Sequence, residues 1–229
     1  MKQKLFGRLV AVAAVLLLSS ATASAHSFEV DGIYYEKNSD GTSVSVTYKG
    51  SYYSSYSNEY SGAVTIPASV TYSGETYSVT SIGDSAFRGC SGLTSVSIGN
   101  SVISISERAF WGCSGLTSVS IGNSVTAIGD YTFYECSGLT SVVIPNSVTS
   151  IGEGTFYECS GLTSVVIPNS VTSIGNSVFY GCSGLTSVSI GNSVTSIGNS
   201  AFAYCSGLTS VEIPNSVKSI GEDAFYGCI

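Results

Sequence analysis

The chain of 229 residues has few basic side chains, with 8 lysines and arginines against 15 aspartates and glutamates. Three of the basic residues and none of the acidic ones lie in the first 25 positions, so the remainder carries a net charge of about −10. The remaining basic residues are scattered: Lys37, Lys49, Arg88, Arg108 and Lys218. A chain without a basic patch cannot neutralise phosphate groups, which disfavours nucleic acids and anionic membranes as partners, and we predict no nucleic-acid partner.

Histidine is almost absent, since His26 is the only one. Nucleophilic and acid–base schemes need a base beside the reacting group, and no serine here has such a partner in the sequence. A copper site of the histidine-brace type needs a second histidine, and a zinc site needs C-x-x-C or Cys/His spacing that the sequence lacks. We therefore predict a non-enzyme with no catalytic residues, no metal and no cofactor.

Long apolar runs are missing except near the N-terminus. There, basic residues precede the ten-residue run Leu9–Leu18, and a small-residue Ala-Ser-Ala sequence ends at Ala25. Ten apolar residues are too few to span a bilayer, and this order is typical of a secretory signal peptide. We predict that residues 1–25 are a signal peptide cleaved near Ala25, and that the protein is exported, either secreted or held at the cell surface, with no membrane span.

The rest of the chain is dominated by a repeat of 23 residues. Cysteine returns at this interval seven times, and phenylalanine precedes each cysteine by three residues. The cysteines are Cys90, Cys113, Cys136, Cys159, Cys182, Cys205 and Cys228. A period this strict is the signature of a solenoid in which each coil stacks on the one before it.

Each unit contains the pattern of a short strand followed by a tight turn. Leu139, Val142 and Ile144 follow the L-x-x-V-x-I spacing of a leucine-rich-repeat strand. Phe156 and Cys159 are three residues apart, as a short turn or one 3₁₀ turn presents them. We predict a β-rich leucine-rich-repeat solenoid with a 23-residue repeat, parallel strands, and short turns or 3₁₀ segments between them.

The N-terminal part departs from the repeat. Residues 27–50 alternate as a β-hairpin does, with the turn sequence Asn-Ser-Asp-Gly at 38–41. We predict three parts: a signal peptide at 1–25, an N-terminal β-hairpin cap at 26–60 and the leucine-rich-repeat solenoid at 61–229.

The unit "LTSVVIPNSVTSIGEGTFYEC" (139–159) resembles the BspA-type leucine-rich repeat of bacterial surface proteins. The resemblance rests on the aliphatic strand, the I-P-x-x-V step, the I-G break and the F-x-x-C turn, and extends from about residue 60 to the end. It implies a secreted or cell-surface binding protein of the adhesin or surface-antigen type. The implied partner is an extracellular protein or glycoprotein, host matrix included.

Two columns of outward residues are candidate binding surfaces. An aromatic column follows the buried phenylalanines: Trp111, Tyr134, Tyr157, Tyr180 and Tyr226. Such a stripe serves either to contact a protein or sugar or to cover the seam between coils. The alternative surface is the outer side of the strands: Ser95, Ser118, Ser141, Val143, Ser164, Val166, Ser187 and Glu212. The competing function is a stalk or spacer without a ligand of its own.

Two further columns have structural and chemical interpretations. The regular cysteines of an exported chain suit disulfides, but their odd number and their position beside phenylalanine favour buried free thiols. An acid and amide column follows each Ile-Gly: Asp84, Glu107, Asp130, Glu153, Asn176, Asn199 and Glu222. Capping of free N–H groups is favoured over calcium binding for this column.

Overall fold

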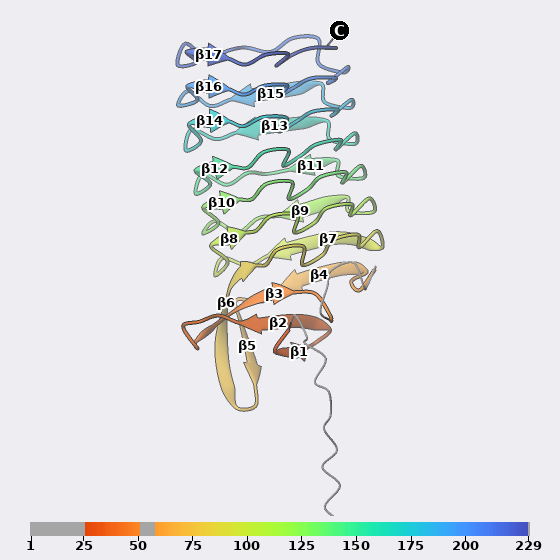
Figure 1. Cartoon of the computed structure of the whole chain (residues 1–229), viewed down its shortest axis with the longest axis vertical. Coiled ribbons are helices and arrows are strands. Elements are labelled where there is room, and N and C mark those ends of the chain that lie inside the picture. Colours follow the sequence, from red (N-terminus) through yellow and green to blue (C-terminus); the bar gives the residue numbers. More distant parts are fainter. Residues whose placement is uncertain (1–25, 51–57, 229) are drawn as a thin grey trace, which may run out of the picture.

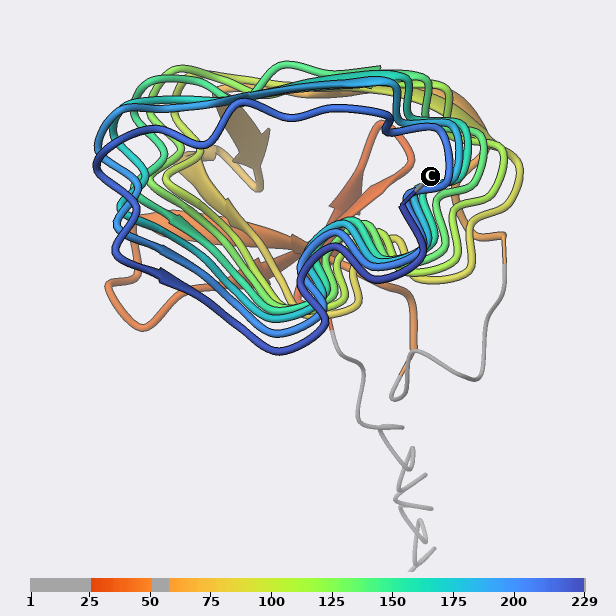
Figure 2. The ribbon, with the colours of Figure 1, turned by 90° about the horizontal axis from the view of Figure 1, so that it is seen from above.

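The computed structural model describes residues 26–50 and 58–228, and within them the chain forms a stack of β-coils (Figure 1). Seen along the stack, successive coils nearly superimpose (Figure 2). No helix in the described ranges is long and apolar enough to cross a membrane. The predicted signal peptide lies outside the described residues.

One long side of the stack is a six-stranded parallel sheet in the order β15-β13-β11-β9-β7-β4. Its strands are β4 (Gly62–Ile66), β7 (Leu93–Ile98), β9 (Ser118–Ser120), β11 (Ser141–Val142), β13 (Ser164–Ile167) and β15 (Ser187–Ile190). From β7 onward, paired residues such as Ser118 and Ser141 are 23 positions apart. Parallel, in-register pairing requires each coil to have the same length, which is why the sequence repeats so strictly.

A second ladder joins short strands on another side of each coil. It runs from β6 (Glu75–Ile82) through β8 (Ser104–Ile105) and β10 (Ala127–Ile128) to β12 (Ser150–Ile151). A separate three-stranded sheet contains β14 (Ser173–Ile174), β16 (Ser196–Ile197) and β17 (Ser219–Ile220). The ladder is therefore interrupted between β12 and β14, so two neighbouring coils are held less closely there.

The N-terminal segment folds as antiparallel strands at one end of the stack (Figure 1). Strand β2 (Ile33–Lys37) pairs with β1 (Phe28–Val30) on one side and with β3 (Ser43–Thr47) on the other. Strand β3 also pairs in parallel with β6, and β6 forms a hairpin with β5 (Ser69–Tyr72). Pairing through β3 covers the edge that the first coil would otherwise expose.

The interior is one continuous apolar core built from columns of identical residues. The central column is a stack of phenylalanine rings whose planes are nearly parallel, with neighbouring centroids 4.9–5.4 Å apart. Six members of the column have no exposed surface: Phe87, Phe110, Phe133, Phe156, Phe179 and Phe202. Offset-parallel rings bury large area at low strain, so this column joins every coil to its neighbours.

The corner after each Ile-Gly is a series of hydrogen-bonded turns, and the alternative of a 3₁₀ segment is wrong for the described coils. Two positions per corner have a positive φ angle, even where they are not glycine: Tyr131 at 55° and Glu135 at 57° in one coil. Backbone N–H groups at these positions donate to the next coil, as Glu135 N does to Tyr157 O at 2.8 Å. These bonds between coils offset the cost of the left-handed backbone.

Candidate binding surfaces

The aromatic column forms a ladder of rings along the corner of the solenoid. Trp111 stacks on Tyr134 with ring centroids 4.1 Å apart, Tyr134 on Tyr157 at 4.6 Å, and Tyr157 on Tyr180 at 4.5 Å. The Arg88 guanidinium lies 4.8 Å from the centroid of the Trp111 ring. The faces of these rings are therefore occupied by one another, and their edges and hydroxyl groups remain for contacts with a partner.

The ladder is half-buried, so it also covers the seam between coils. Burial raises the pKa of Tyr157 to about 12, with the neighbouring tyrosines and Glu158 adding to the effect. Each ring contact of this kind stabilises a fold by about 0.5–1.5 kcal/mol in addition to the stabilisation from burying apolar area. The two interpretations of the column are therefore compatible in this structure, because the rings support the fold while their outer edges remain accessible.

Tyr204 extends the ladder where the predicted column is broken by Ala203. Its ring meets Tyr180 edge-on at 5.2 Å and Tyr226 edge-on at 5.3 Å. The sequence places this tyrosine one residue nearer the cysteine than in other coils, so a search along a fixed column missed it. Tyr204 therefore connects Tyr180 and Tyr226 in one row of ring contacts.

A groove of about 700 Å³ runs beside the ladder and will be called the corner groove. Its lining residues are Gly112, Ser114, Glu135, Ser137, Glu158, Ser160, Tyr180, Gly181, Ser183 and Tyr204. The Glu158 side chain leans over Gly181, where an added Cβ would lie 3.0 Å from its Cγ. Glu135 and Glu158 form no ion pair; among the described residues, the single ion pair joins Arg108 to Glu107 at 2.7 Å. Two uncompensated carboxylates thus project into the groove from a fixed backbone.

The alternative surface, the outer side of the long sheet, is flatter. Ser141 pairs with Ser118 and Ser164 in the parallel ladder, and the serines form a regular row. Val143 and Val166 are 76% and 63% exposed, which makes them the apolar exceptions in this hydroxyl-rich face. Glu212 lines a smaller pocket of about 390 Å³ near the last coils. This face presents a flat row of hydroxyl groups, and its named residues include one charged side chain and no aromatic one.

Three members of the acid and amide column, Asp130, Asn176 and Asn199, cap backbone N–H groups of the next coil. Asp130 Oδ1 accepts a hydrogen bond from Glu153 N at 2.8 Å, and Asn199 Oδ1 accepts one from Glu222 N at 2.9 Å. Asn176 Oδ1 accepts from Asn199 N at 3.0 Å in the same way. These side chains satisfy donors that the turns leave open.

The cysteines are free thiols, as the sequence predicts, and six of the seven are buried. Each buried thiol from the second coil onward donates to the phenylalanine carbonyl of the coil before it, as Cys159 Sγ does to Phe133 O at 3.1 Å. Burial raises the pKa of Cys159 well above its usual value, which disfavours the reactive thiolate. Cys228 in the last coil is only half-buried.

Thiol reactivity should therefore divide the cysteines into two groups. Under native conditions a thiol-specific chromogenic reagent is expected to label Cys228 and to leave the six buried cysteines unreacted. After unfolding in denaturant without reductant, the same reagent should label all seven. Recovery of a single thiol from the unfolded chain would mean three disulfides and would contradict this prediction.

The parallel ladders, the apolar columns and the turn at each corner define a leucine-rich-repeat solenoid. Residues 68–185 and 126–229 match the BspA type leucine rich repeat region, in six copies, and the chain belongs to this family. Among curated proteins, none matches the sequence.

Solved structures of bacterial proteins are similar to this chain. A leucine rich cell surface protein from Faecalibacterium prausnitzii A2-165 is 33% identical with a TM-score of 0.76, and the match covers 92% of this chain and 53% of that protein. This chain therefore spans about half the length of that relative. The leucine rich repeat protein TpLRR of T. pallidum is 30% identical with a TM-score of 0.75, and 88% of each chain is covered. The pneumococcal vaccine antigen PcpA, 20% identical with a TM-score of 0.51 over 90% of this chain and 48% of its own, shares the fold.

Proposed function

We propose that the chain is an exported, non-catalytic repeat protein of the bacterial surface that binds a segment of an extracellular protein in the corner groove. Export rests on the predicted signal peptide at 1–25. The surface setting is supported by the family and by the F. prausnitzii relative, which is described as a cell surface protein. The absence of a histidine other than His26 supports a role without catalysis.

One observation carries the proposal of binding over that of a spacer. The coils repeat almost without change in the core, but the groove row varies: Gly89, Gly112, Glu135, Glu158, Gly181, Tyr204 and Gly227. A spacer needs identical coils throughout, whereas a binding site needs local chemistry. Here two adjacent carboxylates without ion pairs lie between small residues and next to aromatic edges.

The same geometry favours a basic protein segment over a sugar. Sugars bind aromatic side chains through the ring face, and the faces of Trp111, Tyr134 and Tyr157 are covered by neighbouring rings. The carboxylates of Glu135 and Glu158 are suited to lysine or arginine, and tyrosine edges are common at protein interfaces. The negative charge of the whole chain favours the approach of such a partner.

Selection from a random displayed-peptide library tests the partner chemistry directly. We expect the protein without residues 1–25 to enrich peptides that contain lysine or arginine. The double variant Glu135→Gln/Glu158→Gln should bind a selected peptide about tenfold more weakly, because it loses charge-assisted contacts but keeps the shape of the groove. The double variant Glu29→Gln/Glu222→Gln makes the same change in net charge outside both candidate surfaces and should retain affinity.

Two results would contradict the proposal. Failure to enrich any peptide would favour the spacer. Affinity that survives the groove change and is lost in Val143→Ser/Val166→Ser would instead identify the outer side of the sheet as the site.

A further inference from the structure

The first coil contributes one strand to each long ladder, and the N-terminal segment covers only one of these two strands. Strand β6 pairs with β3 on the side away from β8. Strand β4 pairs with β7 and is the last strand of its sheet. No strand within residues 26–50 and 58–228 pairs with the other edge of β4. Backbone N–H and C=O groups of alternate β4 residues therefore lack a strand partner on that edge.

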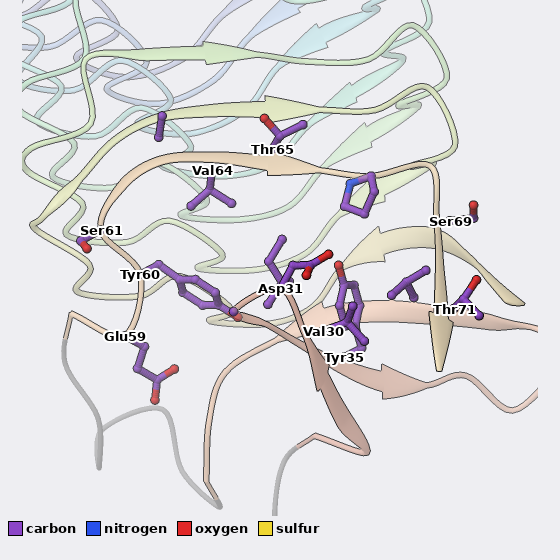
Figure 3. A pocket seen from close by; sticks show the side chains of 15 residues that line it. Val30, Asp31, Tyr35, Glu59, Tyr60, Ser61, Val64, Thr65, Ser69 and Thr71 are labelled. Carbon is purple, nitrogen blue, oxygen red and sulfur yellow. The ribbon is translucent and has the colours of Figure 1, made fainter. Parts of the chain in front are cut away.

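A pocket of about 640 Å³ lies along this free edge, and we call it the edge pocket (Figure 3). Its lining includes three consecutive residues of β4: Ala63, Val64 and Thr65. Side chains of consecutive strand residues point to opposite faces of a sheet, so a pocket that touches all three reaches the edge of the strand and not one face alone. The turn between β1 and β2 and the strand β5 form the other walls.

The walls of the edge pocket are apolar on the inner side and polar on the outer side. Ile33, Tyr35 and Val70 line it and belong to the buried core. Ser69 and Thr71 line it as well and are exposed. The side chains of a strand alternate between two faces, so an extended segment in the pocket can place apolar side chains inward and polar ones outward.

The charged side chains that line the edge pocket are both acidic, and they lie on opposite sides of Tyr60 (Figure 3). Glu59 already has a partner, since its Oε2 accepts a hydrogen bond from Lys49 N at 2.8 Å. Asp31 is exposed at the turn between β1 and β2 and forms no ion pair within the described residues. An exposed carboxylate at the rim favours a basic residue beside the bound segment, with a modest contribution to affinity.

We propose that β4 is a docking edge for an extended segment of a partner protein, which adds a further strand to the long sheet. The segment has alternating apolar and polar side chains and a basic residue beside them. Main-chain hydrogen bonds to β4 supply most of the affinity, and the apolar wall selects alternate side chains. The row of backbone donors and acceptors favours another polypeptide strand, because a strand carries the matching row. The site is separate from the corner groove and does not depend on it.

A synthetic peptide, acetyl-Lys-Leu-Thr-Ser-Val-Ser-Ile-Lys-amide, tests the site. Its centre copies β7, the strand on the other edge of β4, so its apolar residues have the spacing that pairs with β4. We expect calorimetric titration to show that it binds the chain without residues 1–25. Binding should slow hydrogen exchange of amides in β4 at least about tenfold and leave exchange around Glu135 and Glu158 unchanged.

Two N-methylated isomers of the peptide are the decisive probes. One isomer carries N-methyl groups on leucine and both serines, and the other carries them on threonine, valine and isoleucine. The N–H groups of consecutive residues in a strand point to opposite edges, so only one isomer loses its hydrogen bonds to β4. That isomer should bind at least about tenfold more weakly than the parent peptide, and the other should bind within about twofold of it.

Asp31→Asn tests the basic residue of the partner. Asp31 has a φ angle of 52°, and asparagine adopts this left-handed conformation readily, so the turn should be kept while the charge is removed. We expect affinity for the peptide to fall about threefold, and replacement of both peptide lysines by norleucine should have a similar effect. Glu29→Gln on the exposed side of β1 makes the same charge change outside the pocket and should have no effect.

Equal affinity of the two methylated isomers, unchanged affinity in Asp31→Asn, or binding without slower exchange in β4 would overturn the inference. A dimer in sedimentation whose β4 amides are protected without peptide would identify a second copy of the chain as the occupant and overturn it too. The Glu135→Gln/Glu158→Gln variant should still bind this peptide. Loss of binding in that variant would place the peptide in the corner groove, so the two proposals fail separately.

Discussion

Replacing Phe156 by alanine is expected to lower the free energy of unfolding by about 3–5 kcal/mol. The Phe156 ring has no exposed surface and stacks on Phe133 and on Phe179, with a centroid distance of 5.4 Å to each. The cavity cannot close easily, because the backbone on both sides is held by bonds between coils, such as Phe156 N to Val178 O at 2.8 Å. The loss therefore includes both the transfer of the ring and the energy of a retained cavity.

Cys159→Ala is the matched control, since this thiol is buried three residues later in the same corner. It removes a small group and a weak hydrogen bond to Phe133 O, and should cost only about 1 kcal/mol. Equilibrium urea unfolding of both variants, followed by circular dichroism, measures the difference. Similar losses of unfolding free energy in the two variants would contradict the conclusion that the stacked phenylalanine rings make a large contribution to stability.

Much of the fold could be predicted because repetition multiplies a weak local pattern. A single L-x-x-V-x-I segment is ambiguous, but the same spacing around Leu139 and in five other coils leaves little choice about which side chains face inward. The buried phenylalanines and cysteines follow directly from this. The interruption between β12 and β14 could not be predicted, because the sequences of the coils on either side are nearly identical.

Short turns at the corners were among the predicted alternatives, but their left-handed backbone was not predicted, although the sequence contained its signal. Glycine occupies the position two residues after phenylalanine in four coils: Gly89, Gly112, Gly181 and Gly227. All four have positive φ angles, and Glu135, Glu158 and Tyr204 adopt the same conformation in the other coils. Comparing columns for glycine, and not only for apolar residues, would have indicated a left-handed turn instead of a 3₁₀ segment.

The candidate sites were only partly accessible to sequence reasoning. The repeat position after each phenylalanine predicted that Trp111 and the tyrosines lie along one flank. It did not predict that their rings stack face to face, because stacking depends on side-chain rotamers and on the distance between coils. The corner groove depends on which residues lean across the next coil.

Replacing Gly198 by alanine is expected to cost about 3 kcal/mol of stability, at the upper end for overpacking by one methyl group. A Cβ at this position would lie 2.6 Å from the carbonyl carbon of Gly175 and 2.7 Å from Asn176 N, both backbone atoms of the preceding coil. Backbone atoms cannot rotate aside as a side chain can. The coils would have to separate, which would weaken the hydrogen bond from Gly198 N to Ile174 O at 2.9 Å.

Gly175→Ala provides the control in the same column one coil earlier. The nearest atoms to a Cβ at Gly175 are Val178 Cγ2 at 3.5 Å and Ile151 O at 3.6 Å, which are ordinary contacts. The room exists because the ladder between β12 and β14 is interrupted at this coil. Gly175→Ala should therefore change the unfolding free energy by less than about 0.5 kcal/mol, as at an unstrained site. Equal destabilisation in the two variants, measured by urea unfolding, would show that the coils are evenly spaced in solution and that the interruption does not exist.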